Sequence, residues 1–158
     1  MGIYVFLNSF NNISYNNVHD NGIGIELVES NRNNVYRNTI KGNYLFGMLV
    51  INPSFDRIIQ NNFINNHRDV RIWRYIYFQS YIAYRPLPVK FDGNYWDKAR
   101  IFPHPIGGLF ALNLGITAMV WYMLFGEKGE GILLDYYSNF VRFDWHPARE
   151  PYDIPDVG

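Results

Sequence analysis

The sequence has no cysteine among its 158 residues and no net charge. The absence of cysteine excludes disulfides, thiolate metal sites and a cysteine nucleophile, but it assigns the chain to neither side of a membrane. Four basic and four acidic residues lie before residue 67 and ten of each follow, so neither part is strongly charged. A general attraction to nucleic acid or to anionic lipid is therefore not expected.

Asparagine is abundant in only one part of the chain. Sixteen of the first 66 residues are asparagine, against three of the last 92. The asparagine-rich part repeats itself at offsets of 22 and 23 residues, and self-similarity with a period near twenty is the sequence signature of a solenoid. The three segments that align are NNISYNNVHDN (11–21), NNVYRNTIKGN (33–43) and DRIIQNNFINN (56–66).

The spacing of apolar residues predicts which kind of solenoid forms. Each unit begins with a short alternation, such as Gly24-Ile25-Glu26-Leu27, which predicts a strand with one buried face. The second part of the unit breaks that alternation around an asparagine, a residue that tolerates left-handed backbone and therefore suits a corner. Strands and corners that alternate over about 22 residues predict an all-β solenoid, a right-handed parallel β-helix.

The alignment also predicts which residues stack on one another. We expect the corner asparagines to form a hydrogen-bonded ladder, and two apolar columns to point inward. The fourth ladder member is displaced by an insertion at about 73–90. The ladder is Asn16, Asn38, Asn61 and Asn94, and the apolar columns are Ile13, Val35, Ile58 and Val18, Ile40, Phe63.

The repeats predict about four coils over residues 1–106 and a C-terminal capping segment over residues 107–158. The repeat begins directly at Gly2, with no signal peptide and no atypical capping unit before it. We therefore expect the chain to be the C-terminal part of a longer β-helix. Missing upstream coils or self-association would then cover the open strand edges at the N-terminal end. The alternative is a complete chain whose open end a partner shields.

Family resemblance supports this interpretation. The repeats resemble those of carbohydrate-binding and sugar-hydrolase β-helix proteins, a group that includes periplasmic proteins assisting copper assembly in nitrous oxide reductase. Four later segments are similar to the closing part of archaeal and bacterial surface β-helix proteins. They are GNYW (93–96), IFP (101–103), FDWHPA (143–148) and EPYDI (150–154). The resemblance implies the fold and an extracellular or cell-envelope location, and it says little about activity.

The insertion is rich in aromatic residues and arginine. Such side chains stack on sugar rings or on single-stranded nucleic acid, and insertions in repeat proteins often lie on the binding face. The alternative is that they pack on the solenoid wall. We expect no nucleic acid as a partner and treat a polysaccharide or other glycan as the candidate ligand. The candidate glycan-binding residues are Arg71, Trp73, Arg74, Tyr75 and Tyr77.

Residues 106–125 form a run of twenty residues without a charge. A helix of this length would cross the hydrocarbon core of a membrane. Glycines within the run, Asn113 and the lack of a flanking basic cluster argue against a membrane segment. We therefore predict a hydrophobic helix that caps the last coil, with membrane contact as the less favoured alternative.

Catalytic and metal-binding residues are not evident. A glycoside hydrolase needs two suitably placed carboxylates, but Asp20, Glu26, Glu29 and Asp56 form no recurring column. A second group of side chains near the C-terminus, which His104 could approach, has residue types that bind metal ions. Pro147 separates His146 from Glu150, so these two residues cannot take the spacing of ligands on one helix. We predict no catalytic residue, metal site or cofactor, and a non-catalytic carbohydrate-binding or scaffold module at the cell surface. The alternative is a polysaccharide lyase or glycoside hydrolase whose active site lies on upstream coils. The second group of side chains, near the C-terminus, comprises Asp144, His146, Glu150 and Asp153.

Overall fold

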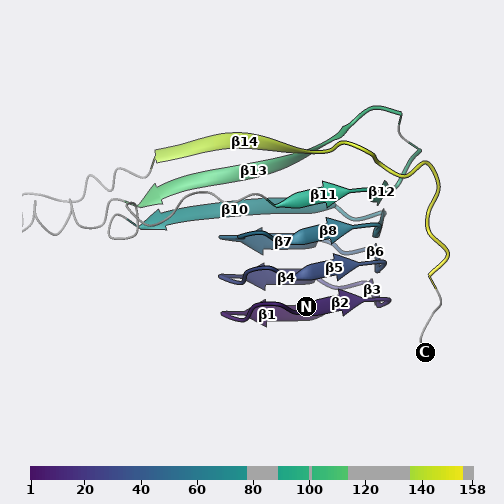
Figure 1. The fold of residues 1–158 in the computed structure, drawn as a ribbon, viewed down its shortest axis with the longest axis horizontal. Coiled ribbons are helices and arrows are strands. Elements are labelled where there is room, and N and C mark those ends of the chain that lie inside the picture. Colours follow the sequence, from purple (N-terminus) through teal and green to yellow (C-terminus); the bar gives the residue numbers. More distant parts are fainter. Residues whose placement is uncertain (78–88, 100, 114–135, 155–158) are drawn as a thin grey trace, which may run out of the picture.

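The computed structural model of the chain describes residues 1–77, 89–99, 101–113 and 136–154. Within these ranges all helix and strand assignments are strands, which stack in three sheets to form the walls of a β-solenoid (Figure 1). The largest sheet contains β1 (Ile3–Phe6), β4 (Ile23–Val28), β7 (Phe46–Ile51), β10 (Val70–Tyr77), β13 (His104–Asn113) and β14 (Tyr136–Asp144). The second contains β2 (Asn12–Ser14), β5 (Asn34–Tyr36), β8 (Arg57–Ile59) and β11 (Lys90–Asp92). The third contains β3 (Asn17–His19), β6 (Thr39–Lys41), β9 (Asn62–Ile64) and β12 (Tyr95–Trp96).

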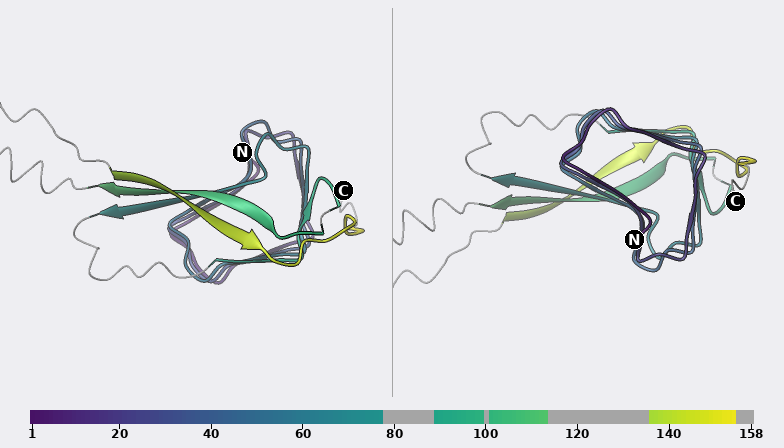
Figure 2. Two further views of the ribbon diagram at one scale, coloured as in Figure 1. Left: turned by 90° about the horizontal axis from the view of Figure 1, so that it is seen from above. Right: turned by 90° about the horizontal axis from the view of Figure 1, so that it is seen from below.

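Each turn of the solenoid gives one strand to each sheet. Three turns, β1–β3, β4–β6 and β7–β9, are described throughout. Strands β10, β11 and β12 add a fourth strand to each sheet, but the link between β10 and β11 at residues 78–88 lies outside the described residues. The expected four coils are therefore described as about three complete turns, superposed in Figure 2 along the direction of stacking.

The predicted register and the inward columns are confirmed. Val35 pairs with Ile13 on one side and Ile58 on the other, and Ile40 pairs likewise with Val18 and Phe63. All six side chains are buried, and those of the second and third turns have no exposed surface. The second column continues into Trp96, whose ring stacks on Phe63 with 4.7 Å between centroids. Since parallel strands lie about 4.8 Å apart, flat rings on adjacent turns fill the core without a gap.

The corners differ from the expectation in one respect. We predicted that the ladder asparagine would take the left-handed backbone, but the residue just before it does so. At the ladder corner the positive φ angles are 59° at Tyr15, 50° at Arg37, 54° at Gln60 and 68° at Gly93. The chain bends at that residue, and the following asparagine keeps its side chain inside the turn, where its amide reaches the next layer.

A column of glycines lies beside a second corner. A Cβ atom built on Gly24 would lie 2.5 Å from the carbonyl oxygen of Gly47 and 2.9 Å from Nδ2 of Asn43. Only glycine leaves room there for both the stacked backbone and the asparagine amide. The recurring glycine of the repeat is therefore explained by close packing against the corner.

The predicted capping helix is wrong where the structure describes it. Residues 106–113 belong to strand β13, and residues 114–125 lie outside the described residues. Strand β13 pairs in parallel with β10, from Ile72 opposite Gly108 to Tyr77 opposite Asn113, and β14 pairs antiparallel on its other side. The edge of β10 offers backbone N–H and C=O groups, and the first part of the uncharged run pairs with them as a strand. No helix within the described residues is long and apolar enough to cross a membrane.

The last strands end the solenoid and extend beyond it. Strands β10, β13 and β14 run out past the outline of the coils, as both views in Figure 2 show. After β14 the chain turns back and runs down the side of the coils (Figure 1). There the backbone of Ala148 donates to the carbonyl of Asn94, and Tyr152 exchanges two 2.8 Å hydrogen bonds with the side chain of Asn62.

Candidate functional site

The asparagine ladder is present, and the hydrogen bonds from one asparagine to the next all point in one direction. The backbone N–H and the Nδ2 of Asn16 both donate to Oδ1 of Asn38, at 3.0 and 2.9 Å. Asn38 donates in the same way to Asn61, and Asn61 to Asn94. Asn38 and Asn61 therefore each accept from the asparagine of the turn before and donate to the asparagine of the turn after.

Two further ladders occupy the other corners, and all three end in a carboxylate. One runs from Asn11 through Asn33 to Asp56, and the other from Asn21 through Asn43 and Asn66 to Asp69. The ladder predicted from the sequence ends at Asp144. An ionised carboxylate accepts hydrogen bonds but donates none, so it terminates a ladder of this polarity. The bonds concerned are Asn11 to Asn33, Asn33 to Asp56, Asn21 to Asn43, Asn43 to Asn66, Asn66 to Asp69 and Asn94 to Asp144.

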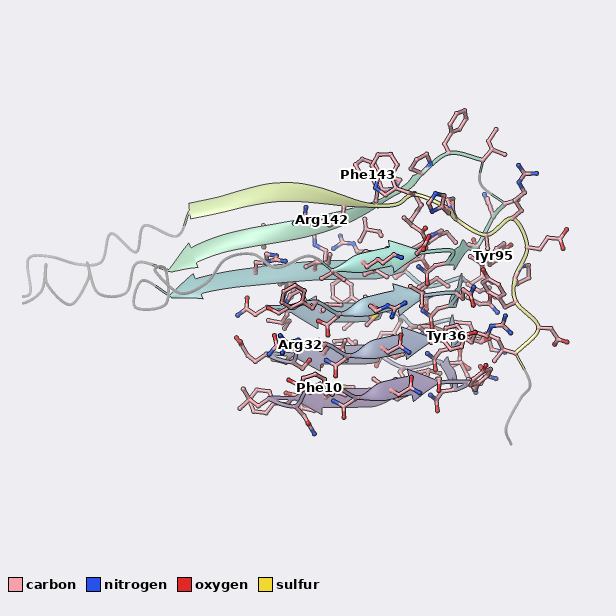
Figure 3. The ribbon with its side chains drawn as sticks, in the orientation of Figure 1. Phe10, Arg32, Tyr36, Tyr95, Arg142 and Phe143 are labelled. Atoms are coloured by element: carbon pink, nitrogen blue, oxygen red, sulfur yellow. The ribbon has the colours of Figure 1, made fainter. Side chains whose placement is uncertain are left out.

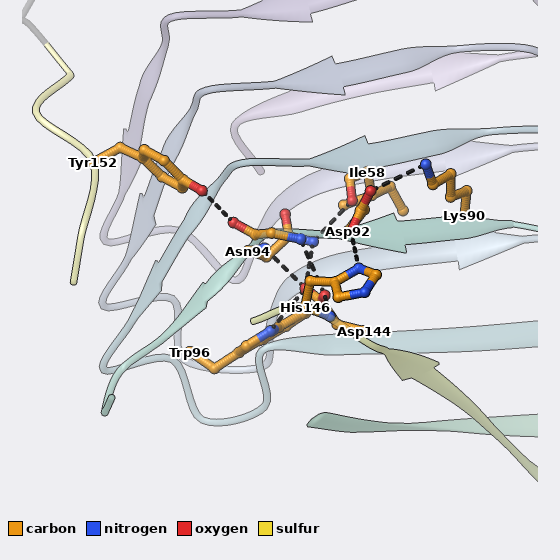
Figure 4. A network of polar contacts seen from close by, with 9 residues as sticks. Ile58, Lys90, Asp92, Asn94, Trp96, Asp144, His146 and Tyr152 are labelled. Atoms are coloured by element: carbon orange, nitrogen blue, oxygen red, sulfur yellow. Dashed lines mark hydrogen bonds and ion pairs between the residues drawn. The ribbon is translucent and has the colours of Figure 1, made fainter. Parts of the chain in front are cut away.

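Asp144 is fully buried at the end of β14 and holds the last turn together (Figure 4). Its Oδ2 accepts from the backbone N–H of Asn94 at 2.8 Å, from Nδ2 of Asn94 at 2.9 Å and from Nε1 of Trp96 at 3.1 Å. Its Oδ1 accepts from the backbone N–H of Gly93 and of His146. In the sequence, Asp144 stands in the closing segment FDWHPA and in a group weighed as metal-binding, but it was not predicted to end the ladder. The unpaired donors expected at the top of the ladder were the signal that a buried acceptor must follow.

A second polar cluster lies on the surface beside Asp144. Nδ1 of His146 lies 2.9 Å from one carboxylate oxygen of Asp92, and Nζ of Lys90 lies 3.0 Å from the other. The hydrogen bonds from His146 and Lys90 lower the pKa of Asp92. This cluster links β11 to the segment after β14 and is mostly exposed, so it fastens the C-terminal segment to the sheet.

Asp56 differs from Asp144 because one of its oxygens has no hydrogen-bond partner among the described residues. The residue is fully buried, and Oδ1 accepts from the backbone N–H and Nδ2 of Asn33. No described residue makes a hydrogen bond to Oδ2. Burial raises the pKa of Asp56 to about 6, although hydrogen bonds from Asn33 and from the backbone of Ser54 act in the opposite direction.

An aromatic–arginine column flanks the outer face of the sheet β2–β5–β8–β11. The guanidinium carbon of Arg32 lies 5.4 Å from the ring centroid of Phe10 and 5.4 Å from that of Phe55. Phe10 and Phe55 are 72% and 42% exposed, so the column is a surface feature. Figure 3 shows Phe10 and Arg32 one above the other at this margin. The 22- and 23-residue offsets align these three residues, so the column was detectable in the sequence and was missed.

Tyrosine and arginine flank the opposite margin of the same face. The rings of Tyr15 and Tyr36 meet edge to face at 5.8 Å, and the guanidinium of Arg37 lies over both Tyr36 and Tyr152. Between the margins, β8 and β11 present the exposed side chains of Arg57 and Lys90. The carboxylate on these strands, Asp92, is already paired. We call the surface formed by the sheet β2–β5–β8–β11 and its two margins the basic face.

The residues predicted to bind glycan lie on β10, and among those whose side chains the structure describes, Arg74 does not share the exposure of Arg71 and Trp73. Arg71 and Trp73 are partly exposed, whereas Arg74 is buried at 5% exposure. Trp73 packs edge to face on Phe46, with 6.1 Å between ring centroids. Tyr75 and Tyr77 continue β10, opposite Ala111 and Asn113 of β13. Glycan binding by these residues stays a prediction.

The acidic residues weighed as catalytic or metal-binding groups are spread over the structure. Glu26 lies on β4, where burial raises its pKa, and Glu29 accepts a hydrogen bond from Asn52. His104 stacks on Trp96 at 4.2 Å. Over the described ranges, no three His, Asp or Glu side chains are grouped closely enough to hold a metal ion.

Three sheets joined by polar ladders define the chain as a parallel β-helix protein. More specifically, residues 1–100 match the family model described as periplasmic copper-binding protein (NosD). This match spans more than half of the chain, so the chain belongs to that family. Comparisons with curated proteins and with solved structures gave no match.

The copper binding named in the family's description does not fit the described residues. Protein copper sites use cysteine, methionine or histidine ligands. This chain has no cysteine, and Met48 is buried in the apolar core. His19 and His146 interact with Asp20 and Asp92 on different parts of the solenoid. We therefore derive no role for copper in this chain.

Proposed function

We propose that the chain is a non-catalytic β-helix module of the cell envelope, which binds carbohydrate through the basic face. The observation that carries the proposal is the placement of the Arg32 guanidinium between two exposed phenylalanine rings. Such a column combines flat apolar surfaces, which suit the faces of sugar rings, with a cation that is held in place. The family's description as periplasmic supports a location where glycans are present.

The charge of the basic face favours glycans that carry carboxylate or sulfate groups. Arg32, Arg37, Arg57 and Lys90 lie on or beside its four strands. Arginine binds planar anions through two parallel hydrogen bonds, and its stacked guanidinium retains outward-facing donors. The stacked turns repeat at about 4.8 Å, so equivalent groups recur along an extended chain laid across them.

The proposal is tested by titrating the purified chain with neutral and acidic polysaccharides by calorimetry. We expect binding to an acidic polysaccharide, and at least a tenfold loss in the double variant Phe10→Ala and Arg32→Ala. The matched control is Tyr44→Ala, which removes a ring that is 69% exposed and lies outside the basic face. Equal loss in the control, or binding to neither class of glycan, would leave a scaffold role without a glycan ligand.

The β10 residues provide a second candidate surface for the same function, tested by the variant Trp73→Ala. If this variant alone abolishes binding, the glycan lies along β10, as the sequence predicted. If only the variant of Phe10 and Arg32 does so, it lies on the basic face. The two surfaces belong to different sheets, so the two variants separate them.

A further inference from the structure

Four large apolar side chains are exposed where strands β13 and β14 cross the last turn of the solenoid. Ile101 and Phe102, in the link between β12 and β13, are 76% and 73% exposed. Phe143 near the end of β14 and Trp145 just after it are 41% and 64% exposed. Single exposed apolar residues are common, but a group of them marks a contact with another molecule or with a membrane. We call these four residues the apolar tip.

Strand pairing brings the two halves of the apolar tip together. Pro105 lies opposite Phe143 and His104 lies opposite Asp144, so the residues just before β13 lie beside those just after β14. The rings of Phe143 and Trp145 are 5.3 Å apart, measured between their centroids. The segments IFP and FDWHPA, which are distant in the sequence, therefore form one surface.

The burial of Asp144 sets the direction in which the apolar tip points. Successive side chains of a strand point to opposite sides. Because Asp144 is buried against Asn94 and Trp96, its neighbours Phe143 and Trp145 point away from the coils. Figure 3 shows Phe143 on the side of β14 away from the coils. The link between β12 and β13 rises past β14 along the direction of stacking (Figure 1), so the tip protrudes.

The charged groups near the apolar tip balance one another. Lys98 and Arg149 are exposed, and neither forms an ion pair with another described residue. Their sequence neighbours Asp97 and Glu150 are exposed as well. Within the tip itself, Nε1 of Trp145 is the one side-chain group able to form a hydrogen bond. The tip therefore matches an uncharged, apolar partner.

The size of the apolar tip favours a membrane over a protein. With their exposed fractions, the four side chains present on the order of 500 Å². Each partner in a standard protein–protein interface buries about 800 Å². A protruding group of aromatic and aliphatic side chains needs no complementary groove in a bilayer, and tryptophan rings lie readily at the level of the lipid headgroups.

We propose that the apolar tip inserts into the interface of a lipid bilayer and holds the solenoid at a membrane surface. The burial of apolar side chains drives the binding, so a zwitterionic lipid is sufficient and an anionic lipid is not required. The stems of Lys98 and Arg149 are long enough for their charges to stay among the headgroups. The family's description as periplasmic supports a location beside a membrane.

The test measures flotation of the full chain with vesicles of pure phosphatidylcholine. We expect binding that changes little between about 0.1 and about 0.5 M NaCl, because salt screens charges and not apolar burial. The double variant Phe102→Ser and Trp145→Ser should bind at least about tenfold more weakly. The matched control is Phe10→Ser and Tyr44→Ser, which removes two rings of 72% and 69% exposure elsewhere and should bind as the unchanged chain does. All four rings are exposed, so circular dichroism should show one thermal midpoint for the three chains.

A second measurement locates the contact. Phosphatidylcholine brominated on its acyl chains quenches the fluorescence of a tryptophan that enters the bilayer. The variant Trp145→Phe keeps an aromatic ring in the tip, so it should still bind the vesicles but lose the quenching. Quenching that persists in this variant would place another tryptophan in the bilayer, such as Trp121 of the uncharged run, and would overturn the proposal.

Three other results would also overturn it. They are equal binding by the double variant and its control, no binding to phosphatidylcholine, and binding that requires an anionic lipid. Sedimentation tests a second copy as the occupant: if the chain is a dimer without lipid and the double variant is a monomer, the tip is a dimer interface and the proposal is wrong. The vesicles contain no carbohydrate, so none of these results depends on glycan binding at the basic face.

Discussion

Asn94 donates both its backbone N–H and its side-chain amide to a single oxygen of Asp144, fifty residues later in the chain. The pair joins the last ladder asparagine to the last strand of the solenoid. Nε1 of Trp96 donates to the same oxygen, so a core side chain is tied to this ending as well. The stability of the last turn is therefore expected to depend on one carboxylate.

Replacing Asp144 with alanine should lower the free energy of unfolding by about 3 kcal/mol or more, because several buried donors lose their acceptor. Urea unfolding followed by tryptophan fluorescence measures the change. The control is Asp153→Ala, since Asp153 is an exposed carboxylate near the same end. Similar losses in both variants would contradict the role assigned to Asp144.

Replacing Asn38 with aspartate tests the polarity of the ladder. The new carboxylate still accepts from Asn16, but it no longer donates to Asn61 or to the carbonyl of Ile13. We expect a loss of about 2–4 kcal/mol at neutral pH, because acceptors then face each other in a buried site. Asn12→Asp is the control: Asn12 is exposed and already acts as an acceptor for Asn34. The idea fails if the two variants unfold alike.

Replacing Asp56 with asparagine should stabilise the protein at neutral pH but not at pH 4. Since burial raises the pKa to about 6, the folded state binds more protons than the unfolded state between about pH 4 and 6. Stability therefore falls as the pH rises through that window, by up to about 3 kcal/mol. The variant should lose this dependence in urea unfolding measured at pH 4 and pH 7.5. An unchanged slope would show that Asp56 does not cause it.

Replacing His146 with alanine should raise the pKa of Asp92 toward its ordinary value, because the largest cause of its lowering is removed. A lowered carboxyl pKa stabilises the folded state above the unfolded value, and that contribution is lost as the pH falls through the folded value. Carboxyl carbon NMR titration measures the pKa directly. His19→Ala, which removes a histidine beside Asp20, should leave the titration of Asp92 unchanged.

The repeated part of the fold was predictable because each turn obeys the same local rules. The offsets of 22 and 23 residues placed Ile13, Val35 and Ile58 in one buried column, and even the displaced Asn94 in its ladder. The left-handed residue was assigned one position too late. Asparagine has the stronger general preference for that backbone, but here its side chain is needed inside the turn.

The non-repeating part was less predictable, since its structure depends on pairing between distant strands. The uncharged run at residues 106–125 is long enough to form a helix. Nothing in the sequence shows that the edge of β10 is free to pair with part of it. The partners of Asp144 are likewise about fifty residues away. For the binding surface, aromatic content indicated β10, whereas the column of Phe10, Arg32 and Phe55 required the repeat offset to be applied to residues outside the aligned segments.

The contact between Asn94 and Asp144 also has a consequence for synthesis of the chain. The first two turns can complete their hydrogen bonds in the ladder while the ribosome is still translating, because Asn16 and Asn38 donate to asparagines only 22 and 23 residues further along the chain. The fourth layer has to wait, with the donors of Asn94 and Trp96 unmatched, until nearly the whole polypeptide has emerged. A nascent chain that stalls before residue 144 would therefore expose an unfinished edge, and the timing of release would decide whether it closes or pairs with a neighbour.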